Sequence, residues 1–160
     1  MRRLLVLFVS TLALAAPATA VASSSLIVIG ESIGPIRLGM PRSEVIQVFG
    51  TPRSTERFEF TSGEVGRVAA YKKHGGGFRV TYADGVVVGI STAARFYRTA
   101  SGVGPGSPRA RAAALPGFRF DQCTAGYVRQ TGDAFTFFTS YAGPRLISHA
   151  EIYRSAYFDC

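Results

Sequence analysis

The sequence predicts an α+β protein made of two small modules in tandem, each a helix on an antiparallel sheet, whose sheets can join into one continuous sheet. Three observations support this fold class. Apolar and polar residues alternate over 78–82 and 86–90, on either side of Asp84-Gly85, a pair typical of a hairpin turn. Residues 40–49 place apolar side chains on one helical face. The turns and strands of the first half recur 67 residues later.

Residues 1–22 have the features of a secretory signal peptide. A positively charged start precedes an apolar run of about 13 residues, and small residues allow cleavage after Ala20 or Ala22. The alternative is a transmembrane anchor, but a bilayer span needs about 20 apolar residues. We therefore expect an exported protein, secreted or extracytoplasmic, whose mature chain has no membrane span.

The first module is predicted over residues 33–97, after a linker at 23–32. Pro41 suits the first position of a helix, and Gly50 followed by Pro52 ends it. Strand patterns follow at 57–61, 67–73, 78–82 and 86–90. One face of this sheet is hydrophobic, so the short helix is expected to cover it.

The second module is predicted over residues 98–160, after a boundary rich in glycine and proline at 102–108. The shift of 67 residues places Gly39, Pro41, Arg42 and Gly50 on Gly106, Pro108, Arg109 and Gly117. A weakly amphipathic helix is expected at 108–115. The expected strands lie at 122–129, 134–141 and 145–158, the last bent near Tyr153.

Residues 33–52 resemble a known kind of module. Their pattern, Ile-Gly-Pro-Ile-Arg-Leu-Gly-Met-Pro-Arg-Ser-Glu-Val and then Phe-Gly-Thr-Pro, is similar to the start of modules in β-lactamase-inhibitor protein and in the SmpA/OmlA envelope lipoproteins. The resemblance implies a helix before a small antiparallel sheet and, as in the inhibitor protein, tandem duplication of that unit. The chain departs from these relatives in two ways. It lacks the lipid-anchor cysteine of the envelope lipoproteins, and it has one cysteine pair where a pair in each repeat is expected. The resemblance carries over no inhibitory residue.

The two cysteines, Cys123 and Cys160, are predicted to form a disulfide, because an even count in an exported chain favours one. The alternative is a catalytic or metal-binding cysteine. Neither His74 nor His149 has ligand spacing to a cysteine, so we expect no metal site.

The chain is basic, with a formal net charge of +8, which favours acidic partners. No acidic residue lies between Asp84 and Asp121, where five arginines fall. Either this stretch is a solvated surface or it is a dedicated binding site. Export makes nucleic acid a poor partner, so we expect a protein or an anionic wall polymer.

Catalytic patterns are sparse. His149 and Glu151 share one face of a predicted strand, and such a pair can act as acid and base, although a surface pair or a half-buried hydrogen bond gives the same spacing. The glycines at 102, 104 and 106 are typical of a phosphate loop, but no parallel strand precedes them and no lysine follows at the expected place. We expect no cofactor.

The second half holds more aromatic residues than a small core needs. Phe137 and Phe138 point to opposite faces of one strand, so at least one is expected to be exposed or covered by a partner. The alternative is that all the aromatics belong to the core. The candidate binding surface comprises Phe137, Phe138, Tyr141, Tyr153 and Arg145.

Three functions remain open. The first is a secreted bacterial non-enzymatic binding module for a protein or cell-wall polymer. The second is a structural envelope protein without a discrete ligand, and the third is a small hydrolase that uses His149 and Glu151.

Overall fold

The computed structural model describes residues 25–140 and 145–158, which are mostly β structure. Strands account for 48% of the structure and helices for 12%. The expectation of two tandem α+β modules is therefore wrong. The α-helices of the described chain have eight and five residues, too short to form a layer of their own over each half of the sheet.

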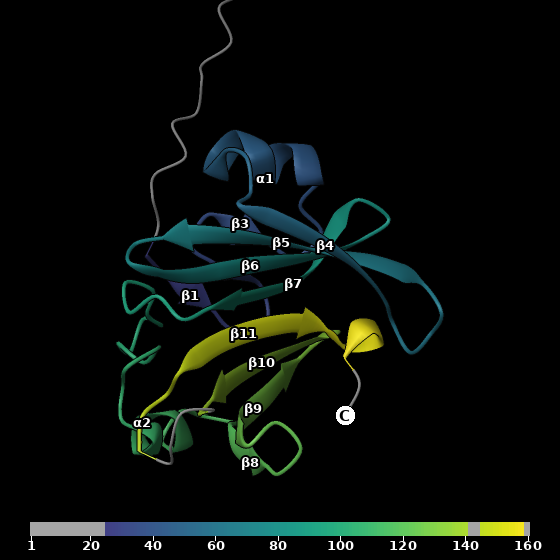
Figure 1. Ribbon diagram of the computed structural model, residues 1–160. Helices are drawn as coiled ribbons and strands as arrows, with labels where there is room; N and C mark the ends of the chain where they lie inside the picture. The colour runs from purple at the N-terminus through teal and green to yellow at the C-terminus, as the bar shows by residue number, and fades with distance from the viewer. Residues whose placement is uncertain (1–24, 141–144, 159–160) are drawn as a thin grey trace, which may run out of the picture.

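A single antiparallel sheet of eight strands forms the body of the protein (Figure 1). Its order is β4-β5-β6-β7-β11-β10-β9-β8, so β7 from the first half pairs directly with β11 from the second. Because this central pair lies inside the sheet, the halves share one sheet and one core. The strands are β4 (Ser54–Glu59), β5 (Val65–Lys73), β6 (Gly76–Ala83), β7 (Val86–Thr92), β8 (Arg119–Asp121), β9 (Gly126–Thr131), β10 (Ala134–Thr139) and β11 (His149–Arg154).

A second, three-stranded sheet comes from the N-terminal end of the described chain. It contains β1 (Ile27–Val28), β2 (Ser32–Ile33) and β3 (Ile36–Arg37). The described part of 23–32 is thus not a linker, because Ile27 is 2% exposed and its backbone N–H donates to the Arg98 carbonyl at 2.7 Å. Its apolar residues join the core instead of connecting two domains.

Helix α1 (Arg42–Phe49) confirms the helix expected at 41–49. Pro41 has an extended backbone at the N-cap, and Gly50 ends the helix with φ 77°, a conformation that glycine adopts without strain. Phe49 packs edge-on against Tyr71 and Phe78, with ring centroids 5.3 and 4.8 Å apart. The apolar face of the helix therefore covers β5 and β6, as expected.

The other helical segments are short. Helix α2 (Arg109–Ala113) buries Ala112, and a 3₁₀ helix, η1 (Ser155–Tyr157), follows β11. Figure 1 shows α1 and α2 at opposite ends of the large sheet. No helix of the described residues is long and apolar enough to cross a membrane.

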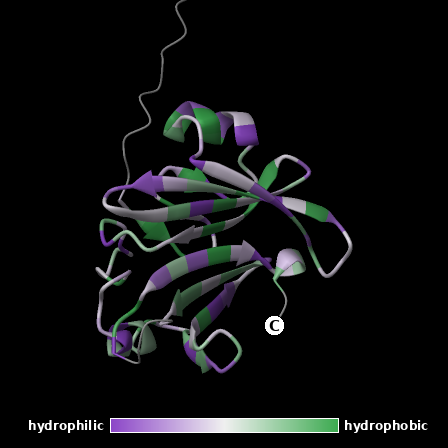
Figure 2. Ribbon diagram, viewed as in Figure 1, coloured by the Kyte–Doolittle hydropathy of each residue, from purple (hydrophilic) through white to green (hydrophobic). Residues whose placement is uncertain are grey.

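The two faces of the large sheet differ. Phe78, Thr92, Ala150 and Phe138 lie side by side in the strand register and are all buried in the core. The opposite face carries Arg79, Ser91, Glu151 and Phe137 in the neighbouring row of register positions. Figure 2 shows the resulting alternation of hydrophobic and hydrophilic residues along β11. We call this second, more polar face the open face.

The hairpin between β6 and β7 confirms the turn expected at Asp84-Gly85. Both residues have positive φ, 47° and 77°, as a tight two-residue turn between twisted strands requires. The register of β6 and β7 shifts between Thr81 and Tyr82, which marks an irregularity in the ladder.

Tyr97 is a buried tyrosine whose replacement by phenylalanine is expected to leave the protein at least as stable at pH 7. Its hydroxyl has no hydrogen-bond partner among the described residues, and a buried hydroxyl without a partner destabilises. Burial raises the pKa of Tyr97 to about 12, above the value of about 10 for an unfolded tyrosine. Below pH 10 the hydroxyl is neutral in both states, and from pH 10 through pH 12 ionisation favours the unfolded state. Urea unfolding of Tyr97→Phe should therefore show a shallower loss of stability above pH 10 than the wild type, and an unchanged slope would contradict this.

The predicted disulfide involves Cys160, which lies outside the described residues. The Cys123–Cys160 disulfide therefore stays a prediction, as does the signal peptide at 1–22.

Candidate functional site

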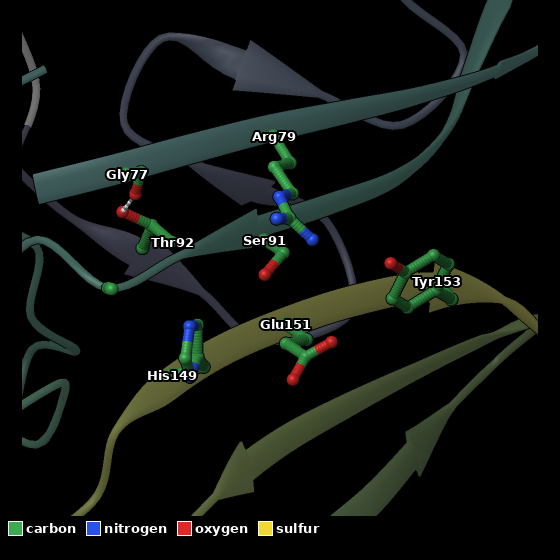
Figure 3. Close-up of a pocket in the computed structure, with 8 residues that line it drawn as sticks. Gly77, Arg79, Ser91, Thr92, His149, Glu151 and Tyr153 are labelled. Carbon is green, nitrogen blue, oxygen red and sulfur yellow. Dashed lines mark hydrogen bonds between the residues drawn. The ribbon is translucent and has the colours of Figure 1, made fainter. Parts of the chain in front are cut away.

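A cleft of about 480 Å³ lies on the open face where β6, β7 and β11 meet. Figure 3 shows Arg79 projecting from β6 and Ser91 from β7, with His149, Glu151 and Tyr153 projecting from β11. Because all three strands are held in the middle of the sheet, the backbone positions of these residues are fixed by hydrogen bonds on both sides. The cleft is lined by Gly77, Arg79, Ser91, Thr92, Ala93, His149, Glu151 and Tyr153.

The strand register places a cation and a carboxylate on opposite walls of this cleft. Arg79 lies opposite Ser91, and Ser91 lies opposite Glu151. Two strand spacings separate the backbones of Arg79 and Glu151, about 10 Å. Arg79 is exposed and forms no hydrogen bond or ion pair with another residue that the structure describes. Its guanidinium is therefore available to an anionic group in the cleft.

Two of the titratable residues of β11, His149 and Glu151, are held by neighbouring hydroxyls. The Thr139 hydroxyl donates to Glu151 Oε1 at 3.0 Å, and His149 Nδ1 lies 3.1 Å from Ser148 Oγ. Both side chains are half-buried. These contacts restrain the carboxylate and the imidazole while leaving both on the wall of the cleft.

Tyr153 forms one end of the cleft because Gly89 makes room for it. Gly89 lies opposite Tyr153 in the register, and a Cβ at this glycine would overlap the tyrosine ring. The ring thus lies over β7 at Gly89. The same face continues beyond Tyr153 as a second hollow, of about 330 Å³, that reaches Phe58 and Tyr157.

The aromatic binding surface expected from the sequence is not an exposed surface. Phe137 is 2% exposed and Phe138 is fully buried, so neither can meet a partner directly. Phe138 packs in the core against Phe118, with centroids 5.3 Å apart. On the open face, Phe158 covers Phe137 at 4.4 Å and approaches Tyr153 at 6.3 Å. The expectation was wrong because Phe138 belongs to the core, while the chain after β11 turns back and covers Phe137 with Phe158.

The remaining candidate residues are dispersed. Arg145 is exposed at a bend, where its carbonyl accepts a hydrogen bond from the Arg109 backbone N–H at 3.0 Å. Tyr141 lies outside the described residues. Of the described residues of the predicted surface, only Tyr153 lines the cleft, beside the His149 and Glu151 pair. Arg79 and Ser91 were not expected at this site, although both occupy polar positions in strands whose alternation is visible in the sequence.

The described residues contain no cluster of three or more histidine, cysteine, aspartate or glutamate side chains that could hold a metal ion. The polar groups of the cleft are instead one cation, one carboxylate, one imidazole and several hydroxyls. Such a set suits a polar organic ligand with groups of both charges.

Comparisons with known proteins address the fold alone. No protein-family model matches the sequence, and no curated protein matches it. A cysteine-rich secretory protein from Staphylococcus aureus has a similar structure, with a TM-score of 0.55 and 10% identity over 74% of this chain. The match covers 45% of the length of that protein.

Two further structures match less closely in shape. The uncharacterised protein YfeY from Escherichia coli has a TM-score of 0.49 and 16% identity, covering 79% of this chain and 95% of that one. The DUF4309 family protein YjgB from Bacillus subtilis has a TM-score of 0.41 and 13% identity, covering 71% and 78%. None of the three is a β-lactamase-inhibitor protein or an SmpA/OmlA lipoprotein, so that resemblance stays a prediction.

Proposed function

We propose that the protein is an exported, non-enzymatic binding module whose ligand site is the cleft between β6, β7 and β11. The observation that carries this proposal is the exposed Arg79 guanidinium facing a hydroxyl-restrained Glu151 across a cavity of about 480 Å³. The signal peptide predicted at 1–22 supports a role outside the cytoplasm.

The ligand class follows from the charges of the cleft. An anionic group is expected to pair with Arg79, and a cationic or hydrogen-bond-donating group with Glu151, about 10 Å away across two strands. A short peptide segment with acidic and basic side chains or termini meets both requirements. Because the site is built on central strands, little ordering is needed on binding, which favours affinity.

Chemical-shift mapping tests this proposal. The nitrogen-15-labelled mature chain is titrated with a tripeptide of aspartate, alanine and lysine whose ends are acetylated and amidated, so that only its side chains are charged. The control is a tripeptide of serine, alanine and glutamine with the same end caps, which carries no charge. We expect the charged peptide to shift backbone amides of β6, β7 and β11, while the uncharged peptide has little effect. Shifts that cluster elsewhere, or no shifts with the charged peptide, would contradict the proposal.

A hydrolase is the second candidate, because the cleft brings His149, Glu151 and Ser91 to one cavity. Binding is favoured over catalysis because Ser91 forms no hydrogen bond with a base among the described residues, as an activated serine nucleophile would. A broad hydrolase panel on the wild type, His149→Ala and Glu151→Gln separates the two functions. Activity in the wild type that both variants lose would favour the enzyme, and equal background activity in all three would remove it.

A further inference from the structure

In the loop between β7 and α2, three glycines each lie against the side chain of an arginine. A Cβ placed on Gly106 would lie 2.8 Å from Arg95 Nε, and one on Gly104 would lie 3.0 Å from Arg98 Nη1. The third pair is Gly102 and Arg111, where the corresponding distance to Arg111 Nη2 is 3.5 Å. The glycine spacing that is typical of a phosphate loop in the sequence therefore gives three guanidinium groups close access to one backbone segment.

The backbone of this loop is held by hydrogen bonds at each turn. The Thr99 N–H donates to the Val103 carbonyl at 2.8 Å, and the Ser107 N–H donates to the Gly104 carbonyl at 3.0 Å. The loop is also fixed to the strand region beyond it, because the Gly106 N–H donates to the Ile147 carbonyl at 2.7 Å. The arginines thus lie on a preorganised support.

Contacts to the loop orient two of the arginines. Arg98 Nη1 donates to the Pro105 carbonyl at 2.5 Å, and Arg111 Nη2 donates to the Ser101 carbonyl at 2.8 Å. Arg95 and Arg111 are exposed, and Arg98 is half-buried. Each guanidinium carries five N–H donors, so these contacts leave donors of all three residues unused.

The cluster has no acidic partner in the described part of the chain. None of the three arginines forms an ion pair with a described carboxylate, and no acidic residue lies between Asp84 and Asp121. Burial, and then the positive charges of Arg95 and Arg111, lower the pKa of Arg98. The positive charge of Arg98 is therefore close enough to each of the other two arginines for repulsion, and a bound anion would relieve it.

We propose that Arg95, Arg98 and Arg111 form an anion-binding site for phosphate groups, on the loop that contains Gly102, Gly104 and Gly106. The planar guanidinium presents paired donors that match the geometry of phosphate oxygens. The phosphate can be free or part of an anionic polymer with repeated phosphate groups. This site is separate from the cleft and does not depend on the proposed cleft function.

Titration calorimetry at low salt tests this site with two probes, inorganic phosphate and long-chain polyphosphate. We expect the double variant Arg95→Gln/Arg111→Gln to bind the effective probe at least about tenfold more weakly than the wild type. Arg98 is left in place because it is half-buried and holds the loop through two contacts, with Pro105 and Ser107, whereas Arg111 is exposed and makes one such contact, with Ser101. Thermal melting of the variant checks that it is folded.

The matched control is Arg57→Gln/Arg67→Gln, which removes two exposed arginines that lie opposite each other on β4 and β5. It changes the net charge equally and should weaken binding less than about twofold. Loop-dependent binding of inorganic phosphate supports a site for single phosphate groups, and loop-dependent binding of polyphosphate alone supports a polymer site. Equal weakening in both double variants, or no binding of either probe, would overturn the proposal.

Discussion

Replacing Phe138 with alanine is expected to lower the free energy of unfolding by about 3–5 kcal/mol. Phe138 is fully buried in β10, opposite Ala150 on one side and Tyr127 on the other. Its ring also packs on Phe118. The strands on both sides are fixed by their ladders, so the sheet cannot collapse into the cavity that the substitution leaves. Urea unfolding followed by circular dichroism measures the change.

Phe120→Ala provides the matched control. Phe120 lies in edge strand β8 and is 50% exposed, with Arg109 stacked over its ring at 4.7 Å. Its loss should cost about 1 kcal/mol or less. A change at Phe138 as small as that at Phe120 would show that the core does not extend through β10.

Replacing Gly89 with alanine is expected to cost about 1–3 kcal/mol and to reshape the cleft. The new methyl group would occupy the position of the Tyr153 ring, and Thr81 closes the remaining space because its Cβ lies 3.1 Å away. Tyr153 must therefore leave its place over β7, which removes one end of the cleft. Thermal unfolding measures the first effect, and the near-ultraviolet circular dichroism of the tyrosines reports the second.

Gly77→Ala serves as the control for this substitution. A Cβ at Gly77 would meet no described atom within 4 Å, although this glycine also lies in a strand of the same sheet. Alanine there should be neutral or slightly stabilising, because glycine within a strand loses more conformational entropy on folding. If Gly89→Ala is as well tolerated as Gly77→Ala, Tyr153 does not occupy the position described.

Local patterns predicted much of the secondary structure. The helix ending at Gly50 and the hairpin at Asp84-Gly85 depend on neighbouring residues only, and both are confirmed. The strands expected at 67–73, 78–82 and 134–141 overlap β5, β6 and β10, with boundaries that differ by a few residues. Periodicity is visible in the sequence because one face of each strand is buried.

The fold class depends on pairing between distant segments, which periodicity does not specify. The pairing of Ile90 with Ile152 joins the two halves across 62 positions. A continuous sheet was allowed for, but it forms one mostly β body and not two helix-on-sheet modules. Ile27 likewise belongs to the core because its backbone is hydrogen-bonded to that of Arg98, which is far along the chain. No local pattern distinguishes such a buried segment from a linker.

The candidate site was predicted in part. The spacing of His149 and Glu151 correctly placed both on one face of a strand, and both line the cleft. Arg79 could not be assigned to the same site from the sequence, because its position beside Glu151 depends on the pairing of β7 with β11. The burial of Phe137 depends on Phe158, which reaches it only after the chain turns at η1.

The affinity of the charged tripeptide for three variants tests the cleft most directly. Titration calorimetry compares Arg79→Gln and Glu151→Gln with Arg67→Gln, whose side chain is exposed on β5 away from the cleft. We expect each cleft variant to weaken binding by about tenfold, the loss of one charge-assisted hydrogen bond. Arg67→Gln should bind like the wild type. Wild-type affinity in both cleft variants, or the same loss in Arg67→Gln, would contradict the assignment of the cleft as the binding site.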